Sequence, residues 1–453
     1  MLLNILLRRD DMENNMNILL RVIKSLVLIA LVIFPVKAFA DAGSVYRKAI
    51  GSIAVVTAYN RAGEELTEGS GFVADKEGAV VTNYHVIGIG KAIKVRIGGR
   101  VMDVKGVLYS DKENDLVVLK TGAGAIPAVR LGDSEKLRPG EKVYIVSGTE
   151  GMAHEGVFKG TKTVMHGRRA LEISVPASHG SSGSAVFNSD GEVIGIVTFF
   201  IDRGHPLVWA MPVNLIRGRT SSKDALLSVD RVIKEYSRTP EYWFYLGYYL
   251  SASGAHKEAA GVLKEAIRIK PGYADAYYYL GIASEKLSRN KEAEKAYRKA
   301  VKAAPDFADA WFSLGMLHGK QGLYREAIEA FRQAVRFAPD FPDAYYSMGV
   351  AYGKLGLFRE SADAYKQTLR LKPDFGDAYY NLGIAFQKSA AYAESAAVFE
   401  KLIKLKPDYA EAHYNLGLVS LVLKDKDAAL ERYKVLKGLN PGLAGKLLNL
   451  IYN

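Results

Sequence analysis

The sequence predicts a multi-domain protein in which an all-β half is followed by an all-α solenoid. Between Asp41 and about Arg219 the chain consists of short runs rich in β-branched residues, such as SIAVVTAY and GEVIGIVTFF, separated by glycines. Such runs are typical of an all-β barrel or sandwich. Further along, prolines recur every 34 residues, at positions 271, 305, 339, 373, 407 and 441, and a fixed period of this kind indicates stacked helical repeats. We therefore expect domains at 41–220 and 240–453, joined by a linker helix within 221–239.

The composition is that of an ordinary globular protein long enough for two or three domains. The 453 residues are 49% hydrophobic and carry a formal net charge of +12. Because the charges are interleaved and form no block of like sign, we interpret the excess as a solvated surface and expect no nucleic-acid partner. The chain has no cysteine, which excludes disulfides, thiolate metal ligands and a cysteine nucleophile. It also lacks HExxH, P-loop and dinucleotide-binding patterns, so we expect no metal and no cofactor.

The first 40 residues read as an export signal. A basic stretch beginning at Met16 precedes the apolar run SLVLIALVIFPV, and the tripeptide AFA ends at Ala40, which predicts cleavage after that residue. The apolar run is shorter than the roughly 20 residues that span a bilayer. We therefore expect a periplasmic protein, with a membrane anchor formed by an uncleaved signal as the alternative. Residues 1–15 do not fit the signal pattern, which suggests that translation starts at Met16 or Met12.

The pattern inside the 34-residue period is that of tetratricopeptide (TPR) repeats. We expect six units from about Pro240 to Asn440, followed by a partial capping helix. A glycine recurs in the same slot of each unit, where the absence of a β-carbon lets two helices approach closely. These glycines are Gly247, Gly281, Gly315, Gly349, Gly383 and Gly417.

The repeats also predict a groove, because such arrays curve and the first helix of each unit lines the concave face. The TPR pattern implies an acidic row of groove positions: Asp275, Asp309, Asp343, Asp377 and Glu411. Beside it the pattern implies an aromatic row: Tyr278, Phe312, Tyr346, Tyr380 and Tyr414. One interpretation is a binding surface for an extended peptide of a substrate or partner protein. The alternative is that each acidic residue caps a helix.

Three residues in the N-terminal half suit nucleophilic acyl transfer. His85 follows the run GAVVTNY, Asp115 begins the run DLVVLK, and Ser182 lies in the glycine-rich segment HGSSGSAVF. A serine hydroxyl needs a neighbouring base, and the base needs a carboxylate that fixes its tautomer. Gly180, two residues before the serine, would let the backbone turn its amide toward a developing oxyanion.

These phrases and their order resemble the bacterial HtrA/Deg family of trypsin-like serine proteases, over roughly residues 45–217. The resemblance implies an all-β chymotrypsin-like double β-barrel with the catalytic residues in the cleft between its two barrels. It implies that Ser182 is the nucleophile, His85 the general base and Asp115 the orienting carboxylate, and that the amides of Gly180 and Ser182 form the oxyanion hole. It further implies an S1 pocket formed by Pro176, Thr198, Phe199, Phe200 and Trp209. With no acid at its base, that pocket predicts cleavage after small or medium apolar residues.

The sequence departs from the family at two places. The usual Gly-Asn-Ser-Gly-Gly turn carries Ser181 and Ser184 here, and Ser181 suits its position because it is small and able to hydrogen-bond the local backbone. If position 184 requires a positive φ, Ser184 costs strain on the order of 1 kcal/mol. The PDZ domains of the family are replaced by the repeats.

Two functions remain open from the sequence. The first is an exported serine endopeptidase that hydrolyses misfolded or specific envelope proteins, with the repeats recruiting a substrate or partner. The second is a catalytically weak or inactive scaffold that organises an envelope or secretion assembly through the repeat groove. The resemblance also allows a homo-oligomer.

Overall fold

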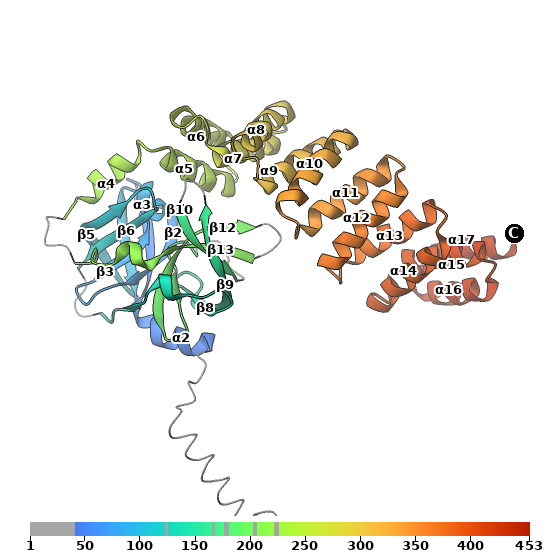
Figure 1. The fold of residues 1–453 in the computed structure, drawn as a ribbon, viewed down its shortest axis with the longest axis horizontal. Coiled ribbons are helices and arrows are strands. Elements are labelled where there is room, and N and C mark those ends of the chain that lie inside the picture. The colour runs from blue at the N-terminus through green and yellow to red at the C-terminus, as the bar shows by residue number, and fades with distance from the viewer. Residues whose placement is uncertain (1–40, 123–125, 165–167, 176–180, 203–205, 222–225) are drawn as a thin grey trace, which may run out of the picture.

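The computed structural model contains a β-rich body and an arc of helices that extends away from it (Figure 1). It describes residues 41–122, 126–164, 168–175, 181–202, 206–221 and 226–453. The predicted signal, residues 1–40, lies outside this part of the chain. No helix within the described ranges is both long and apolar enough to cross a membrane.

Six antiparallel strands close the first barrel in the order β1-β2-β3-β6-β5-β4. They are β1 (Ile53–Tyr59), β2 (Glu65–Val73), β3 (Ala79–Asn83), β4 (Ala92–Ile97), β5 (Arg100–Asp111) and β6 (Leu116–Thr121). Buried β-branched side chains such as Val56, Val80 and Val95 fill its interior, as expected for strands with a packed face. Asn83 at the end of β3 pairs with Leu116 at the start of β6. This register brings the residues after β3 beside those before β6.

The second sheet has seven strands in the order β11-β8-β9-β10-β13-β12-β7. They are β7 (Arg130–Leu131), β8 (Lys142–Ser147), β9 (Met152–Val164), β10 (Arg168–Ser174), β11 (Ala185–Phe187), β12 (Glu192–Asp202) and β13 (Pro206–Pro212). Because β11 also pairs with β12, six strands form a closed ring, and β7 adds to β12 in parallel. The predicted double β-barrel is therefore confirmed.

Short helices occur where the sequence analysis expected only strands. The helix α2 (Ala42–Ala49) precedes β1, and the Asp41 side chain caps it by accepting from the Ser44 amide. Its apolar residues Val45 and Ala49 pack into the hydrophobic cluster that joins the two barrels. The five-residue helix α3 (Tyr84–Gly88) follows β3 directly. The described residues up to 221 also contain three 3₁₀ turns: η1 (Ile50–Ser52), η2 (Ser134–Lys136) and η4 (Val213–Ile216).

The C-terminal part is all-α, as predicted, and consists of six helix pairs and a final helix. They are α5 (Pro240–Ala252), α6 (His256–Ile269), α7 (Ala274–Lys286), α8 (Asn290–Ala303), α9 (Ala308–Lys320), α10 (Tyr324–Phe337), α11 (Pro342–Lys354), α12 (Phe358–Leu371), α13 (Gly376–Lys388), α14 (Tyr392–Leu405), α15 (Ala410–Val422), α16 (Lys426–Leu439) and α17 (Pro441–Tyr452). A β-carbon at any of the six recurring glycines would lie within 2.7 Å of a packed side chain. The close approach expected there is thus present.

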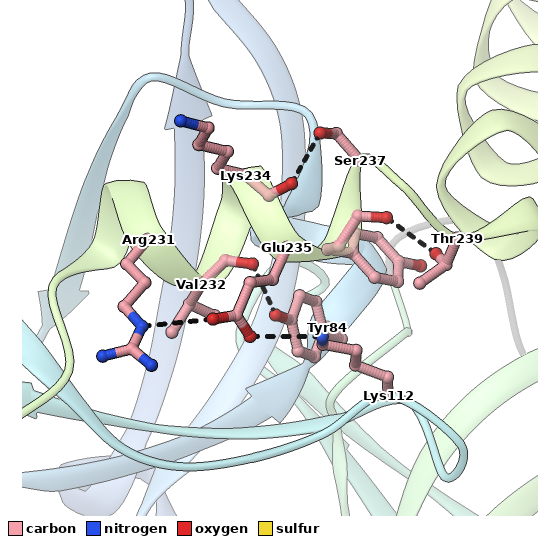
Figure 2. Close-up of polar contacts among 9 residues, drawn as sticks. Tyr84, Lys112, Arg231, Val232, Lys234, Glu235, Ser237 and Thr239 are labelled. Atoms are coloured by element: carbon pink, nitrogen blue, oxygen red, sulfur yellow. Dashed lines mark hydrogen bonds and ion pairs between the residues drawn. The ribbon is translucent and has the colours of Figure 1, made fainter.

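The linker between the two halves packs tightly against the first barrel. Leu227 forms an antiparallel bridge with Val107 of β5, and α4 (Val229–Tyr236) follows. Burial raises the pKa of Tyr84, so its hydroxyl stays protonated and donates to the Val232 carbonyl at 2.7 Å, as Figure 2 shows. Figure 2 also shows Glu235 between Arg231 and Lys112. Hydrogen bonds from these two cations lower the pKa of Glu235.

Candidate active site

The β3–β6 register brings His85 and Asp115 together. The Asp115 Oδ2 atom lies 2.5 Å from His85 Nδ1, and Oδ1 accepts from the His85 backbone amide at 2.9 Å. The Tyr84 amide and the Asn83 side chain both donate to the Asp115 carbonyl. Both side chains of the pair are only 3% exposed. A buried carboxylate held in this way fixes the imidazole with Nδ1 toward the acid and leaves Nε2 for another partner.

The backbone of Asp115 adopts a left-handed conformation, with φ of 57°. Non-glycine residues rarely occupy this region, and those that do are enriched at functional sites. Thr198 supplies a further contact, because its hydroxyl donates to Asp115 Oδ2 at 2.9 Å. The β12–β13 register shifts between Val197 and Phe199, so Thr198 sits at an irregularity of the kind that re-aims a side chain.

Ser182 lies in a turn that forms backbone hydrogen bonds with both barrels. Its carbonyl accepts from the Ser70 amide of β2 at 2.8 Å, and the Gly183 amide donates to the Val197 carbonyl of β12 at 2.7 Å. A β-carbon at Gly69, the neighbour of Ser70, would contact both Val86 and the Ser182 carbonyl. The serine and the helix that carries His85 therefore flank the same point of β2. Among the described contacts, none joins Ser182 Oγ to the His85 ring, and such bonds are often long without substrate.

Position 184 does not require a positive φ, so the condition for strain at Ser184 is not met. The positive φ of the turn falls on Gly183, at 84°, where a β-carbon would lie 2.0 Å from the Ser70 carbonyl oxygen. Glycine is therefore required at position 183, whereas Ser184 is fully buried in an ordinary conformation. The serine at this family glycine position therefore costs no left-handed backbone strain.

Ser181 hydrogen-bonds an acid that is distant in the sequence. Its hydroxyl donates to Glu150 Oε1 at 3.0 Å, and Glu150 Oε2 lies 2.5 Å from His154 Nε2. Glu150 precedes β9 and is 31 residues away from Ser181 in sequence. No local motif signals this contact, so sequence reasoning missed Glu150.

The residues expected to form the S1 pocket are only partly described. Thr198 is buried and contacts Asp115 as above, a role that the sequence did not reveal. The Trp209 ring is buried in the cluster between the barrels. Phe199 and Phe200 lie on β12, but their side chains are outside the described part, as are Pro176 and Gly180 altogether. The pocket and the oxyanion hole therefore remain predictions.

The two predicted groove rows have different surroundings. The N-cap positions of the first helices are Tyr273, Phe307, Phe341, Phe375 and Tyr409, with no side-chain cap. The acidic row lies two residues later, so these acids do not occupy the N-cap positions, although an acid in the first turn still favours the helix dipole. Four of the aromatic-row rings pack against the ring 29 residues ahead, such as Tyr278 with Phe307 at 4.9 Å. These rings therefore contribute to the packing between neighbouring repeats. Binding of a peptide by the two rows remains a prediction.

The first repeat helix contacts the His85–Asp115 pair. Tyr245 of α5 stacks on the His85 ring, with 4.3 Å between ring centroids and 16° between ring planes. Tyr249, one turn later, has its centroid at 6.3 Å. Burial and the charge of Asp115 raise the pKa of Tyr249. Sequence reasoning assigned these tyrosines only to the repeats.

Comparison with known families covers both halves of the chain. Residues 69–196 match the trypsin-like peptidase domain. Residues 320–356 and 391–421 match a family described as TPR repeat, and two families described as tetratricopeptide repeat match residues 250–316 and residues 219–274 with 346–391.

Curated relatives match about a third of the chain. A probable periplasmic serine endoprotease DegP-like from Marinomonas sp. (strain MWYL1) is 34% identical over 140 residues, which cover 30% of each protein. Its counterpart from Pseudomonas putida (strain W619) is 32% identical over 167 residues, 34% of each protein. The anti-sigma-I factor RsgI9 of Acetivibrio thermocellus is 32% identical over 157 residues, 34% of this chain and 22% of that protein. The chain thus spans about a third or less of the length of these relatives. It contains a trypsin-like peptidase domain with DegP-like homologues, followed by a C-terminal array of tetratricopeptide repeats.

Proposed function

We propose that the protein is a serine endopeptidase that uses Ser182 as nucleophile, His85 as general base and acid, and Asp115 as orienting carboxylate. The observation that carries this proposal is the buried His85–Asp115 pair, held by two bonds between them and by Thr198. Few purely structural roles need an aspartate with a left-handed backbone conformation that hydrogen-bonds an imidazole beside a turn that carries a serine. The match of residues 69–196 to the trypsin-like peptidase domain supports the same assignment.

In this mechanism the Ser182 hydroxyl attacks the scissile carbonyl carbon while its proton passes to His85 Nε2. Asp115 stabilises the imidazolium that forms, and backbone amides of the serine turn stabilise the oxyanion. Collapse of the intermediate breaks the C–N bond, and the imidazolium gives its proton to the leaving amine. Water, activated by the same imidazole, then hydrolyses the acyl-enzyme and restores Ser182.

We further propose that the enzyme acts after export, on misfolded or specific envelope proteins. The signal-like N-terminus and the names of the periplasmic DegP-like relatives support this location. The repeats would recruit a polypeptide substrate or a protein partner, since such arrays offer extended concave surfaces. The apolar S1 residues predict cleavage after small or medium apolar side chains, and rapid cleavage after arginine would contradict that preference.

The decisive test is labelling of the purified protein with a fluorophosphonate probe, which reacts with an activated serine and needs no knowledge of the substrate. We expect the wild-type protein to be labelled and the Ser182→Ala variant to remain unlabelled. Circular dichroism and thermal melting of the variant should match the wild type, because the side chain is small and partly exposed. Equal labelling of both proteins, or labelling of neither in folded samples, would contradict the proposal.

A non-catalytic scaffold is the second candidate. One observation favours it: the His85 side chain is almost fully covered, on one face by a helix of the repeats. The similarity to an anti-sigma factor also supports it, because that protein is named for regulation. Under this alternative, neither protein in the labelling experiment would react, even with unfolded polypeptide present.

A further inference from the structure

The first repeat helix forms part of the wall around the catalytic histidine. Tyr245 covers one ring face of His85 at 4.3 Å, nearly parallel to it, and Tyr245 is itself buried. Asp115 constrains the same ring in a second direction, because its carboxylate contacts the Nδ1 atom at the ring edge. The imidazole is therefore fixed along its edge by the barrel and across its plane by the repeat array. Figure 1 shows α5 lying over the barrel next to α3.

The position of Tyr245 is set by packing on both sides of the junction. Its neighbour Phe244 contacts Tyr245 at 5.1 Å and also reaches Tyr273 and Tyr279 of the second repeat. On the barrel side, Tyr236 of α4 packs at 4.2 Å on Tyr84. A β-carbon at Gly88 would lie 2.4 Å from the Tyr236 ring.

One hydrophobic core encloses these contacts. It includes barrel residues such as Val86 and Ile87 and repeat residues such as Phe244, Tyr245 and Leu263. A ring embedded in such a core has little freedom to leave its neighbour.

We propose that Tyr245 is a positioning residue of the catalytic triad, so that the first repeat completes the active site of the peptidase domain. The tyrosine face keeps the His85 ring in the plane that Asp115 and Ser182 require. It also stabilises the imidazolium formed during attack, because a cation within about 6 Å of an aromatic face is attracted by the ring quadrupole. This inference rests on the proposed function, since a positioning residue needs a triad to position.

The proposal has a consequence for the role of the repeats. If the array only recruited substrate, loss of the contact between Tyr245 and His85 would leave the reactivity of Ser182 unaltered. If α5 completes the site, the same change slows the chemical step for any acylating agent. The rate of fluorophosphonate inactivation separates the two roles, because this small probe needs no repeat groove.

The test compares Tyr245→Phe and Tyr245→Leu in the full-length protein. Phenylalanine keeps the ring face, so we expect an inactivation rate within about twofold of the wild type. Leucine fills the space without a π face, and we expect inactivation to be roughly 5- to 30-fold slower, the loss that a desolvated cation–π contact implies. With a cleavable peptide, the loss should appear in kcat, with KM little changed.

Tyr248→Leu is the matched control. Tyr248 lies on the same helix but packs against Tyr279 of α7, and the structure gives it no ring contact with His85. We expect this variant to keep the wild-type inactivation rate. If Tyr245→Leu lowers the Tm by more than about 10 °C, Tyr245→Met replaces it, because methionine adapts to irregular space.

Failure of this inference differs from failure of the proposed function. An unlabelled wild type removes the triad itself. A labelled wild type with an unchanged Tyr245→Leu rate would leave the peptidase intact and show that the stack is only structural. A faster rate in Tyr245→Leu would also overturn the inference, because it would make the ring a cover over the histidine. A rate loss in Tyr248→Leu equal to that in Tyr245→Leu would trace the effect to general loosening of α5.

Discussion

Ser181 connects the turn that carries Ser182 to a second acid–imidazole pair, Glu150 and His154, which is separate from His85 and Asp115. Its hydroxyl donates to Glu150, and Glu150 in turn meets His154. Ser181 is only 4% exposed, so the loss of its acceptor would leave a buried hydroxyl without that bond. Because the next residue is Ser182, a relaxation of Ser181 would shift the proposed nucleophile. Small displacements of a nucleophile are costly for reaction rate.

We therefore expect Glu150→Ala to slow fluorophosphonate inactivation about tenfold, close to the value of one hydrogen bond to a charged group. The control is Glu155→Ala. Glu155 is also near the start of β9 but forms a surface ion pair with Lys142, and its loss should not change the rate. Equal rates for Glu150→Ala and the wild type would show that Ser181 does not depend on Glu150.

Local sequence located the three candidate catalytic residues but not their supports. The phrases around His85 and Asp115 place them after one strand and before another, and the structure has both arrangements. The contacts from Thr198 and Glu150 join residues 83 and 31 positions apart. Thr198 and Asp115 lie on different barrels, and Glu150 and Ser181 lie on separate loops of the second barrel. Both contacts depend on tertiary folding, which no short pattern encodes. Which position of the turn carries the positive φ was equally unreadable, because Gly183 is forced by the distant Ser70 carbonyl.

At the scale of single elements, the helix pairs depend on the recurring glycine. In the third pair, a β-carbon on Gly315 would lie 2.6 Å from the Phe331 ring and 3.1 Å from the Ala327 carbonyl oxygen. The two helices therefore approach more closely than any side chain at position 315 allows. Gly319, four residues later on the same helix, has open space around its β-carbon position. A side chain would therefore clash at position 315 and fit at position 319.

We expect Gly315→Ala to destabilise the repeat array by about 1–3 kcal/mol, the usual cost of overpacking. Gly319→Ala should be neutral or stabilise by up to about 1 kcal/mol, because alanine is the better helix former. Urea unfolding followed by circular dichroism at the helical signal measures both. The reverse order of stability would contradict the packing argument.

The repeat elements were predictable because their signal is periodic, and the short helices were not. The 34-residue period by itself predicts that all six glycines lie where two helices approach closely, and all six do. In contrast, α2 and α3 have eight and five residues, too few for a helical period to stand out. Both form because they cover a barrel: α2 buries Val45 and Ala49, and α3 buries its whole length.

At the scale of the whole molecule, the boundary between the peptidase domain and the repeats is not a boundary in the core. One cluster of buried residues runs from the interior of the first barrel through α4 to α5, α6 and the start of α7. Later repeats have separate clusters, and the last one joins α16 to α17. The sequence predicted a linker between two domains. It could not predict that the first repeat packs against the barrel, because the apolar face of α5 has the same sequence pattern as that of any repeat helix.

This arrangement predicts how destabilisation spreads through the chain. In a linear array each repeat contacts only its neighbours, and local stability follows the packing of each unit. Phe244→Ala removes a buried ring from the shared core and should cost about 3–5 kcal/mol. Leu436→Ala removes a buried side chain from the last cluster and should cost about 2–5 kcal/mol. The two changes are similar in size but lie at opposite ends of the array.

Hydrogen exchange measured by mass spectrometry distinguishes the two variants. Phe244→Ala should speed exchange in α3, α4 and α5 together and should slow labelling of Ser182, because the helix that carries His85 loses its cover. Leu436→Ala should speed exchange in α15, α16 and α17 and leave both the barrel and the labelling rate unchanged. Faster exchange of α5 alone in Phe244→Ala, with α3 as protected as in the wild type, would show that the barrel holds the helix that carries His85 without the repeats. Altered labelling in Leu436→Ala would instead require coupling along the whole array, which contacts between neighbouring repeats do not provide.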